Sequence, residues 1–462
     1  MRDLLRLTLA EAISTPAPGL TRRDVHLPKV PGKAMAIIGV RRCGKTTYLW
    51  QCLAERLAAN TPREALPLLG LEDDRLAGLQ VADLAWLVEE YFRDYPALRT
   101  DPRVTFFLDE IQTVPGWEKF IRRLIDTEKV NIFLTGSSAR LLSREVATSM
   151  RGRALEVLIH PFSFREALRH AGAEPEAAWN KLPASSRSNL DHRLHRYLEV
   201  GGFPEAQGID ERDRTALLRS YVDVVVLRDV IERHSVSNPL PLRHMQRHLL
   251  GNPAGLFSVQ KFYASLRSQG LAVGKDSLHA YLSFLEDAFL IRTVSLHTAS
   301  ERQRMVNPRK VYPVDPGLIP IYERSGRPNL GHALETVVLL ELERRGYEVA
   351  YIRTSQGYEV DFLASAPDLP PLLVQVSADV HEPDTYEREV RALVAAAEEH
   401  PRAQALLLTL ESTPPQPGLP APLEWRWAGD WLSLRPKASH PPCAMQSSSR
   451  FQAEGTAAVL FW

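Results

Sequence analysis

The chain has 462 residues, and at roughly 100 to 200 residues per domain that length predicts about three domains. Hydrophobic residues make up 44% and charged residues 24%, which are ordinary values for globular proteins and exclude a wholly disordered or fibrous chain. Lysine plus arginine and aspartate plus glutamate both number 56, so the net charge gives no sign of a polyanionic partner. Any nucleic-acid site must therefore be a local patch.

The spacing of the cysteines and the length of the apolar runs indicate in which cellular compartment the chain works. Cys43, Cys52 and Cys443 lack the spacing of a disulfide framework or a zinc cluster, which fits a reducing environment. Charges interrupt the apolar run of the first ten residues, and no stretch of about 18 uncharged apolar residues follows. We therefore expect a cytoplasmic protein without a membrane partner.

The first third of the chain alternates strand and helix patterns. Residues 1–30 combine a short amphipathic stretch with four prolines and predict an N-terminal lead-in. Residues 34–40 predict a buried strand, and residues 45–59 predict a helix. Three further apolar runs predict strands of the same parallel sheet: 66–71, 104–108 and 130–134. Residues 31–160 are thus predicted to form a doubly wound α/β domain.

The middle of the chain is mostly helical in pattern. Residues 161–236 predict a helical lid, interrupted by Gly201-Gly202-Phe203-Pro204, which cannot continue a helix. Between residues 257 and 291 three short helical patterns are separated by glycines. That spacing favours a helix-turn-helix or winged-helix unit over residues 237–325.

A second α/β block is predicted over residues 326–435. A helix at 332–345 opens it, and four strand-like runs follow: 349–352, 359–364, 372–376 and 405–410. Residues 436–462 contain two prolines in succession and a run of three serines, so we expect a disordered tail.

The turn after the first strand carries the most specific motif. Gly39 to Thr46 fits G-x-x-x-x-G-K-[ST] between a strand and a helix, where backbone N–H groups and a helix N-terminus bind phosphate. Lys45 would contact the β and γ phosphates, and Thr46 would bind Mg²⁺. The predicted ligands are ATP and Mg²⁺, although these residues alone do not distinguish ATP from GTP.

An acidic pair follows the predicted strand at 104–108. Asp109 would bind the Mg²⁺ shell and Glu110 would polarise the attacking water. Because four apolar residues precede the pair, it is expected at the end of a buried strand rather than on a free surface.

Small hydroxyls and arginines after residues 130–134 suggest further contacts. Ser137 is the candidate γ-phosphate sensor, provided that its strand lies between the strand at 34–40, which precedes Lys45, and the strand at 104–108, which precedes Asp109. Arg140 or the Arg151–Arg153 cluster could supply a cationic finger to the transition state. Surface salt bridges remain the alternative role for these arginines.

At this point the chain resembles bacterial and archaeal AAA+ type ATPases that carry a C-terminal domain of unknown function (DUF4143 type) similar to PD-(D/E)XK nucleases. The resemblance rests on these segments: 39–47, 107–112, 134–139, 152–153, 161–166, 201–204 and 310–318. It implies a nucleotide site that includes Gly39, Gly44, Lys45, Thr46 and Thr47, and a Gly-Gly-x-Pro segment near the nucleotide. It further implies Asp109 as the metal-binding carboxylate, Glu110 as the catalytic one, and Arg153 as a sensor or finger.

The C-terminal block departs from the nuclease pattern. Such centres need two acids and a lysine that converge on Mg²⁺ and water. Glu335 and Asp361 match the first requirements, whereas the next strand reads Gln375-Val376-Ser377, with a neutral amide in place of the acid that precedes the lysine and a hydroxyl in place of the lysine. We therefore expect a degenerate site of Glu335, Asp361 and Gln375, and a structural or binding role rather than cleavage.

The sequence leaves three functions to distinguish: an ATPase that switches or remodels a partner, a nucleotide-gated DNA- or protein-binding module with little turnover, and a metal-dependent nuclease, which we disfavour. Basic residues of the predicted winged helix suit DNA, but such units also serve as packing modules. They include Lys261, Arg267, Lys275 and His279. An oligomer and the identity of the partner stay open.

Overall fold

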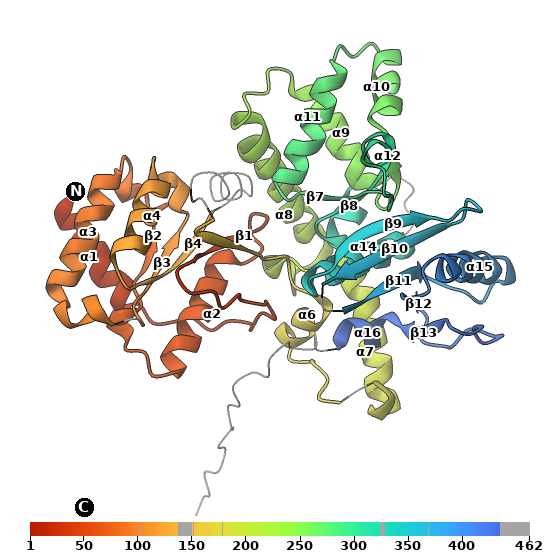
Figure 1. The fold of residues 1–462 in the computed structure, drawn as a ribbon, viewed down its shortest axis with the longest axis horizontal. Helices are drawn as coiled ribbons and strands as arrows, with labels where there is room; N and C mark the ends of the chain where they lie inside the picture. Colours follow the sequence, from red (N-terminus) through yellow and green to blue (C-terminus); the bar gives the residue numbers. More distant parts are fainter. Residues whose placement is uncertain are drawn as a thin grey trace, which may run out of the picture.

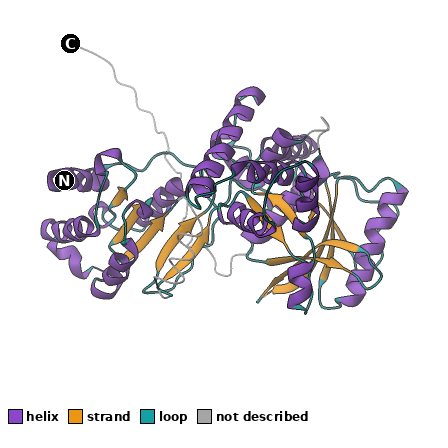
Figure 2. Cartoon of the chain, turned by 90° about the horizontal axis from the view of Figure 1, so that it is seen from above, coloured by secondary structure: helices purple, strands orange, loops and turns teal. Residues whose placement is uncertain are grey.

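The computed structural model describes residues 1–101, 103–136, 150, 152–177, 179–323, 329–367 and 369–434. Two five-stranded sheets and one three-stranded sheet organise these residues (Figure 1). Figure 2 shows the two larger sheets apart from each other, each with its own helices. The chain is therefore α/β overall, as predicted. The predicted tail lies outside the described residues.

The N-terminal sheet is parallel throughout, with strand order β2-β3-β4-β1-β5. Its strands are β1 (Ala34–Ile38), β2 (Leu68–Gly70), β3 (Thr105–Asp109), β4 (Asn131–Thr135) and β5 (Ala154–Leu158). The helices around it are α1 (Arg2–Ser14), α2 (Lys45–Ala58), α3 (Val81–Asp94) and α4 (Trp117–Thr127). Strand β4 separates β1 from β3, which is the condition set for the sensor prediction. Strand β5 was not predicted, because Glu156 breaks its short apolar run.

The middle region contains the three-stranded antiparallel sheet, with order β6-β8-β7. Its elements are α8 (Glu211–Val224), η7 (Val225–Glu232, a π-helix), α9 (Pro239–Gly251), β6 (Leu256–Phe257), α10 (Val259–Ser268), α11 (Lys275–Asp287), β7 (Ile291–Val294), α12 (Glu301–Val306), β8 (Arg309–Pro313), η8 (Pro316–Leu318) and α13 (Ile319–Tyr322). From α9 to β8 the elements run α-β-α-α-β-α-β, and the winged-helix interpretation stays a prediction. Residues 257–291 hold two helices, α10 and α11, rather than the three predicted, because Gly270 and Gly274 bound a single turn.

The C-terminal sheet is mixed, with order β13-β12-β11-β10-β9. Its elements are α14 (Leu330–Arg344), β9 (Glu348–Arg353), β10 (Glu359–Ala366), β11 (Leu369–Ser377), α15 (Pro383–Glu399), β12 (Gln404–Thr409), β13 (Glu424–Trp427) and α16 (Ala428–Ser433). The predicted helix and four strands are present within a few residues of their expected bounds. Helix α15 and strand β13 were not predicted.

The hydrophobic cores do not follow the predicted lid boundary. One core joins the N-terminal sheet to η7 and α9–α11 of the middle region. A second core joins the C-terminal sheet to α6 (Phe164–His170) and α7 (Ala184–Val200). Residues 161–236 therefore do not form one lid, since their first half packs on the C-terminal domain and their second half on the middle region. Among the described residues, no helix has the length and apolarity to cross a membrane.

Candidate functional site

The turn between β1 and α2 has the conformation that its glycines permit. Gly39 has φ +148°, and a Cβ there would lie 2.2 Å from the carbonyl oxygen of Ile159, so no larger residue fits. Gly44 has φ +99°, in the left-handed region that favours glycine. Helix α2 starts at the next residue, so its free N–H groups face this turn. The arrangement is suited to an anion such as phosphate.

Lys45 and Thr46 occupy the first turn of α2. The Lys45 ammonium is buried and donates to the carbonyl oxygens of Gly39 and Val40, both at 3.1 Å. The Thr46 hydroxyl donates to Oδ2 of Asp109 at 2.8 Å. Thr47 is exposed in the same turn. The structure thus brings the predicted phosphate-binding lysine, the hydroxyl and the strand-end carboxylate to one edge of the sheet.

Asp109 and Glu110 both contact Thr135, the last residue of β4. The Thr135 hydroxyl bonds to the Asp109 carboxylate and accepts the backbone N–H of Glu110 at 2.9 Å. Burial raises the pKa of Asp109, and the hydroxyls of Thr135 and Thr46 oppose that rise. Glu110 has a left-handed backbone with φ 54°, and the Gln112 amide donates to its carboxylate. A non-glycine residue in this region costs about 1–3 kcal/mol, which marks Glu110 as a positioned residue.

Thr135 is a site residue that our sequence analysis missed. The signal was present, because Thr135 is the first hydroxyl after the buried run of β4. Ser137 was chosen instead, and it lies outside the described residues. Since β4 lies between β1 and β3, its end is the place from which a side chain can contact both motifs.

Arg153 does not lie in this site. It directly precedes β5 at the end where β1 begins, and its backbone carbonyl accepts the N–H of Ala34 at 2.9 Å. Its guanidinium pairs with Asp126 at the end of α4. The P-loop follows the opposite end of β1, so the prediction that Arg153 contacts this chain's own nucleotide is not supported. Arg140 and Arg151 lie outside the described residues.

Two arginines tie the P-loop to neighbouring elements. Arg23 is buried and donates to the carbonyl oxygens of Cys43 at 3.0 Å and His160 at 2.6 Å. Arg41 donates to both carboxylate oxygens of Asp229, on η7, at 2.7 and 3.0 Å. Sequence analysis had assigned neither arginine to the site. The P-loop is therefore bonded both to the end of β5 and to the middle region.

The Gly-Gly-x-Pro segment reaches the P-loop, as the resemblance implied. A Cβ placed on Gly44 would lie 4.0 Å from Cγ of Pro204. The adjacent Glu205 pairs with Arg42 at 3.3 Å on the surface. Pro204 thus stands beside the turn that would hold phosphates.

The structure also brings Glu335, Asp361 and Gln375 together, in a second cluster that we call the acidic centre. The Asp361 carboxylate accepts the N–H of Val376 at 3.0 Å, and Oε1 of Gln375 accepts the N–H of Asp361 at 3.3 Å. Burial and the nearby Asp361 raise the pKa of Glu335 to about 8. Gln375 donates to Glu389 at 2.5 Å.

A cation that sequence analysis placed elsewhere completes the acidic centre. The Lys310 ammonium, from β8 of the middle region, lies within 2.9–3.1 Å of the carboxylates of Asp361, Glu359 and Glu335. Although burial opposes its charge, these carboxylates raise the pKa of Lys310. Sequence analysis included Lys310 only as the first residue of the family segment 310–318. Among the described residues, no group of His, Cys, Asp and Glu side chains has the arrangement of a metal site.

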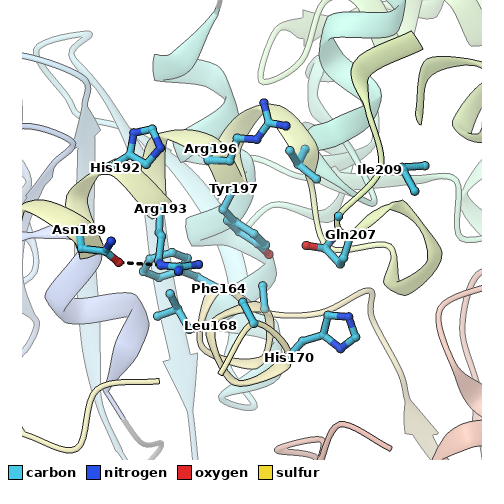
Figure 3. Close-up of a pocket in the computed structure, with 14 residues that line it drawn as sticks. Phe164, Leu168, His170, Asn189, His192, Arg193, Arg196, Tyr197, Gln207 and Ile209 are labelled. Atoms are coloured by element: carbon cyan, nitrogen blue, oxygen red, sulfur yellow. Dashed lines mark hydrogen bonds between the residues drawn. The ribbon is translucent and has the colours of Figure 1, made fainter. Parts of the chain in front are cut away.

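A cavity of about 590 Å³ lies apart from both clusters, between α6 and α7 (Figure 3). Phe164 and Leu168 of α6 form part of its apolar wall, while Arg193 and Arg196 of α7 border it. A smaller hollow of about 280 Å³ touches Asp109 at the edge of the N-terminal sheet. Only the smaller hollow adjoins a predicted site residue.

The parallel sheet, the P-loop and the Thr46–Asp109 contact define a P-loop ATPase fold of the AAA class. Family models match three segments of the chain, and the first of them agrees with this class. An AAA domain matches residues 31–168, a domain of unknown function (DUF8612) matches residues 191–324, and a restriction endonuclease domain matches residues 329–416.

Two relatives are similar over most of the chain. An uncharacterized protein of Methanocaldococcus jannaschii, MJ1544, is 33% identical over 374 residues, which are 80% of each chain. An uncharacterized protein of Haemophilus influenzae is 30% identical over 355 residues, 76% of this chain and 84% of that one. The chain belongs to the family of these proteins, with an AAA-type P-loop ATPase domain and a C-terminal domain of the restriction-endonuclease type.

Solved structures give weaker likenesses. The Walker-type ATPase PABY2304 of Pyrococcus abyssi aligns with 16% identity and a TM-score of 0.40, covering 70% of this chain and 95% of its own. AMPPCP-bound DnaA from Aquifex aeolicus aligns with 13% identity and a TM-score of 0.25, covering 62% and 86%. At these TM-scores neither protein indicates a function for the chain.

Proposed function

We propose that the chain is a cytoplasmic Mg-dependent ATPase that uses hydrolysis to switch or remodel a partner bound by its C-terminal half. One observation carries the proposal: Thr46 and Asp109 meet at 2.8 Å, at the edge of the sheet where Lys45 and Glu110 also lie. A hydroxyl and a carboxylate so placed are the oxygen ligands that Mg²⁺ takes beside a nucleotide. The glycine-lined turn and the N-terminus of α2 fit the phosphates.

Each residue of this edge has a role in the proposed reaction. Lys45 binds phosphate oxygens, and Thr46 and Asp109 hold Mg²⁺, which would neutralise charge on the β and γ phosphates. Glu110, whose carboxylate accepts from Gln112, takes a proton from the attacking water. The Thr135 hydroxyl bonds to the Asp109 carboxylate and to the backbone N–H of Glu110, and so fixes the positions of the two acidic residues relative to each other. Ser137 is proposed as the γ-phosphate sensor two residues further on.

Phosphate release by the full chain tests the proposal. Lys45→Ala removes the phosphate-binding ammonium and should lower kcat/KM by about 100-fold or more. Glu110→Gln should retain ATP binding and lose turnover, because the amide cannot accept the proton. Lys119→Ala, an exposed lysine on α4, is the matched control and should behave like the wild-type protein. Turnover that is absent from the wild type, or survives both substitutions, would refute the proposal.

A nucleotide-gated binding module with little turnover is the second candidate. It is favoured by the Arg41–Asp229 pair, which joins the P-loop directly to the middle region, where the winged helix is predicted. Binding of duplex DNA that changes with ATP and weakens steeply with salt would support DNA as the partner. DNA affinity that ignores both ATP and the Lys45→Ala substitution would remove this candidate.

A further inference from the structure

Lys310 lies on β8 of the middle region, but its side chain contacts the acidic centre of the C-terminal domain. Its ammonium lies 2.9 Å from Asp361, 3.0 Å from Glu359 and 3.1 Å from Glu335, and the residue is only 4% exposed. The position where a nuclease-like strand would carry a lysine holds Ser377, whose hydroxyl donates to the carbonyl of Asp379 at 2.9 Å instead. The positive charge of this centre therefore comes from β8.

Strand β8 packs into two cores at once. Tyr312, two residues after Lys310 and so on the same face, donates its hydroxyl to Oε1 of Glu335 at 2.7 Å. Tyr312 belongs to the core of the C-terminal sheet. Val311, on the other face, belongs to the core shared by the middle region and the N-terminal sheet. A displacement of β8 would thus disturb both cores.

The residues after β8 form a tight junction with the Gly-Gly-x-Pro segment. The Asp315 carboxylate is buried and accepts the N–H of Gly202 at 2.6 Å and that of Gly317 at 3.0 Å. A Cβ on Gly201 would lie 1.8 Å from Asp315, and one on Gly317 would lie 2.3 Å from the carbonyl of Val200. We call Gly201, Gly202, Asp315 and Gly317 the glycine junction.

The glycine junction continues to the P-loop. The carbonyl of Gly202 accepts the N–H of Phe162 at 2.7 Å, just beyond β5. Two residues after Gly202, Pro204 stands beside Gly44. Backbone packs directly on backbone at Phe162–Gly202 and at Val200–Gly317, and the short side chains of Asp315 and Pro204 make the remaining contacts. Such close contacts tend to move together rather than deform gradually.

We propose that Lys310 is a residue of the acidic centre, and that segment 310–317 makes the state of this centre depend on nucleotide bound at the P-loop. The proposal rests on the proposed function to the extent that nucleotide binds beside Pro204. Segment 310–317 is the coupling element because Lys310 lies in one site and Asp315 holds the turn that borders the other. Coupling between two sites acts in both directions, so a substitution at Lys310 that disturbs the acidic centre should also change the affinity for nucleotide.

The first experiment changes the acidic centre and measures the nucleotide site. In the full chain, Lys310→Met keeps most of the length of the side chain and removes the positive charge that lies against three carboxyl groups. The affinity for a fluorescent ATP analogue should fall by at least about fivefold, the lower end of typical coupling. Lys181→Met, an exposed lysine outside both sites, should leave the affinity unchanged.

A second variant separates loss of charge balance from general damage. If Lys310 acts as the counter-charge, Asp361→Asn in the Lys310→Met background should restore part of the lost thermal stability and nucleotide affinity, because it removes the carboxylate nearest the ammonium. A double variant no better than Lys310→Met alone would overturn the assignment of Lys310 to the centre.

The reverse experiment uses the wild-type chain and stands even if the variants do not fold. Hydrogen exchange of the β8 and Gly202 amides should slow when Mg-ATP is added. Unchanged exchange at β8 despite measurable ATP binding, or a folded Lys310→Met variant with wild-type affinity, would overturn the coupling. Neither result depends on turnover. The proposal of ATP hydrolysis and the proposal of coupling can therefore be refuted independently of each other.

Discussion

The nucleotide site and the acidic centre are built in different ways. The residues of the nucleotide site lie at the ends of three adjacent parallel strands. Lys45 follows β1, Asp109 ends β3 and Thr135 ends β4. Each is therefore marked by a short local pattern in the sequence. The acidic centre takes Glu335 and Asp361 from the C-terminal domain and Lys310 from the strand of another region. Short motifs thus identify the first site, whereas only tertiary structure reveals that Lys310 belongs to the second.

The two sites also differ in how exposed their residues are to solvent. Thr46 is exposed at the nucleotide site, where a ligand must enter. Lys310, Glu335 and Asp361 are all buried, and three carboxylates surround one ammonium. A buried charge whose partner is removed costs more than an exposed one, so changes near the acidic centre should affect stability more than changes at the nucleotide site.

The largest effect is expected at Asp315, where the two sites connect. Burial raises the pKa of Asp315 from an ordinary value of 3.8 to about 7, against its two backbone N–H bonds. The folded state therefore binds a proton that the unfolded state releases. The stability from this group is complete below about pH 4 and is lost as pH rises to about 7, by about 1.4 kcal/mol per pH unit within that window.

Denaturant unfolding between pH 4 and 8 measures this contribution. Asp315→Asn should flatten the fall in the free energy of unfolding with pH, because the amide does not titrate. Glu335, whose pKa is also raised, will leave some slope in both proteins. Parallel curves for the variant and the wild type would mean that Asp315 titrates as an ordinary carboxyl.

A smaller effect is expected from Thr135→Val at the nucleotide site. The substitution keeps the shape and removes the hydroxyl that bonds to Asp109 and to the N–H of Glu110. Residues that orient a metal-binding carboxylate typically affect activity by about 10- to 100-fold, and kcat for phosphate release should fall within that range. Thr105→Val removes a buried hydroxyl at the opposite end of β3 and should leave kcat unchanged. Equal losses in both variants would assign Thr135 to packing.

The smallest effect is expected from Arg153→Ala. Arg153 and Asp126 form a partly exposed pair at the far end of the sheet, and such pairs contribute about 0–1 kcal/mol. Both stability and turnover should therefore stay near wild type. A large loss of turnover that appears only at high protein concentration would instead show Arg153 acting on the nucleotide of a neighbouring copy.

Local patterns predicted the elements around the nucleotide site well. The turn at Gly39, the start of α2 at Lys45 and the strand end at Asp109 each depend on a few consecutive residues, so spacing and apolar runs were sufficient. The sequence could not choose between Thr135 and Ser137, because both are hydroxyls after the same strand. The choice depends on how far β4 extends beside β3.

The acidic centre was predicted only in part, for a physical reason. Glu335, Asp361 and Gln375 lie on elements that the patterns identified, and they do converge. Lys310 lies 25 residues before Glu335, and no local pattern indicates where a buried ammonium finds its counter-charge. Lys310 and Tyr312 are two residues apart and so lie on the same face of β8, and this spacing was the available signal that both side chains contact one partner. The split of residues 161–236 between two cores likewise depends on long-range packing.

The shared packing has a consequence for anyone who would excise the C-terminal domain. Helices α6 and α7, which precede it by more than a hundred residues, pack on the apolar face of its helices α14 and α16, and Tyr197 and Leu194 of α7 belong to its hydrophobic core. A fragment beginning at residue 329 would leave that apolar face open to water and three carboxylates without their ammonium. The smallest autonomous folding unit is therefore discontinuous in sequence, and β8 and α7 must be expressed with it.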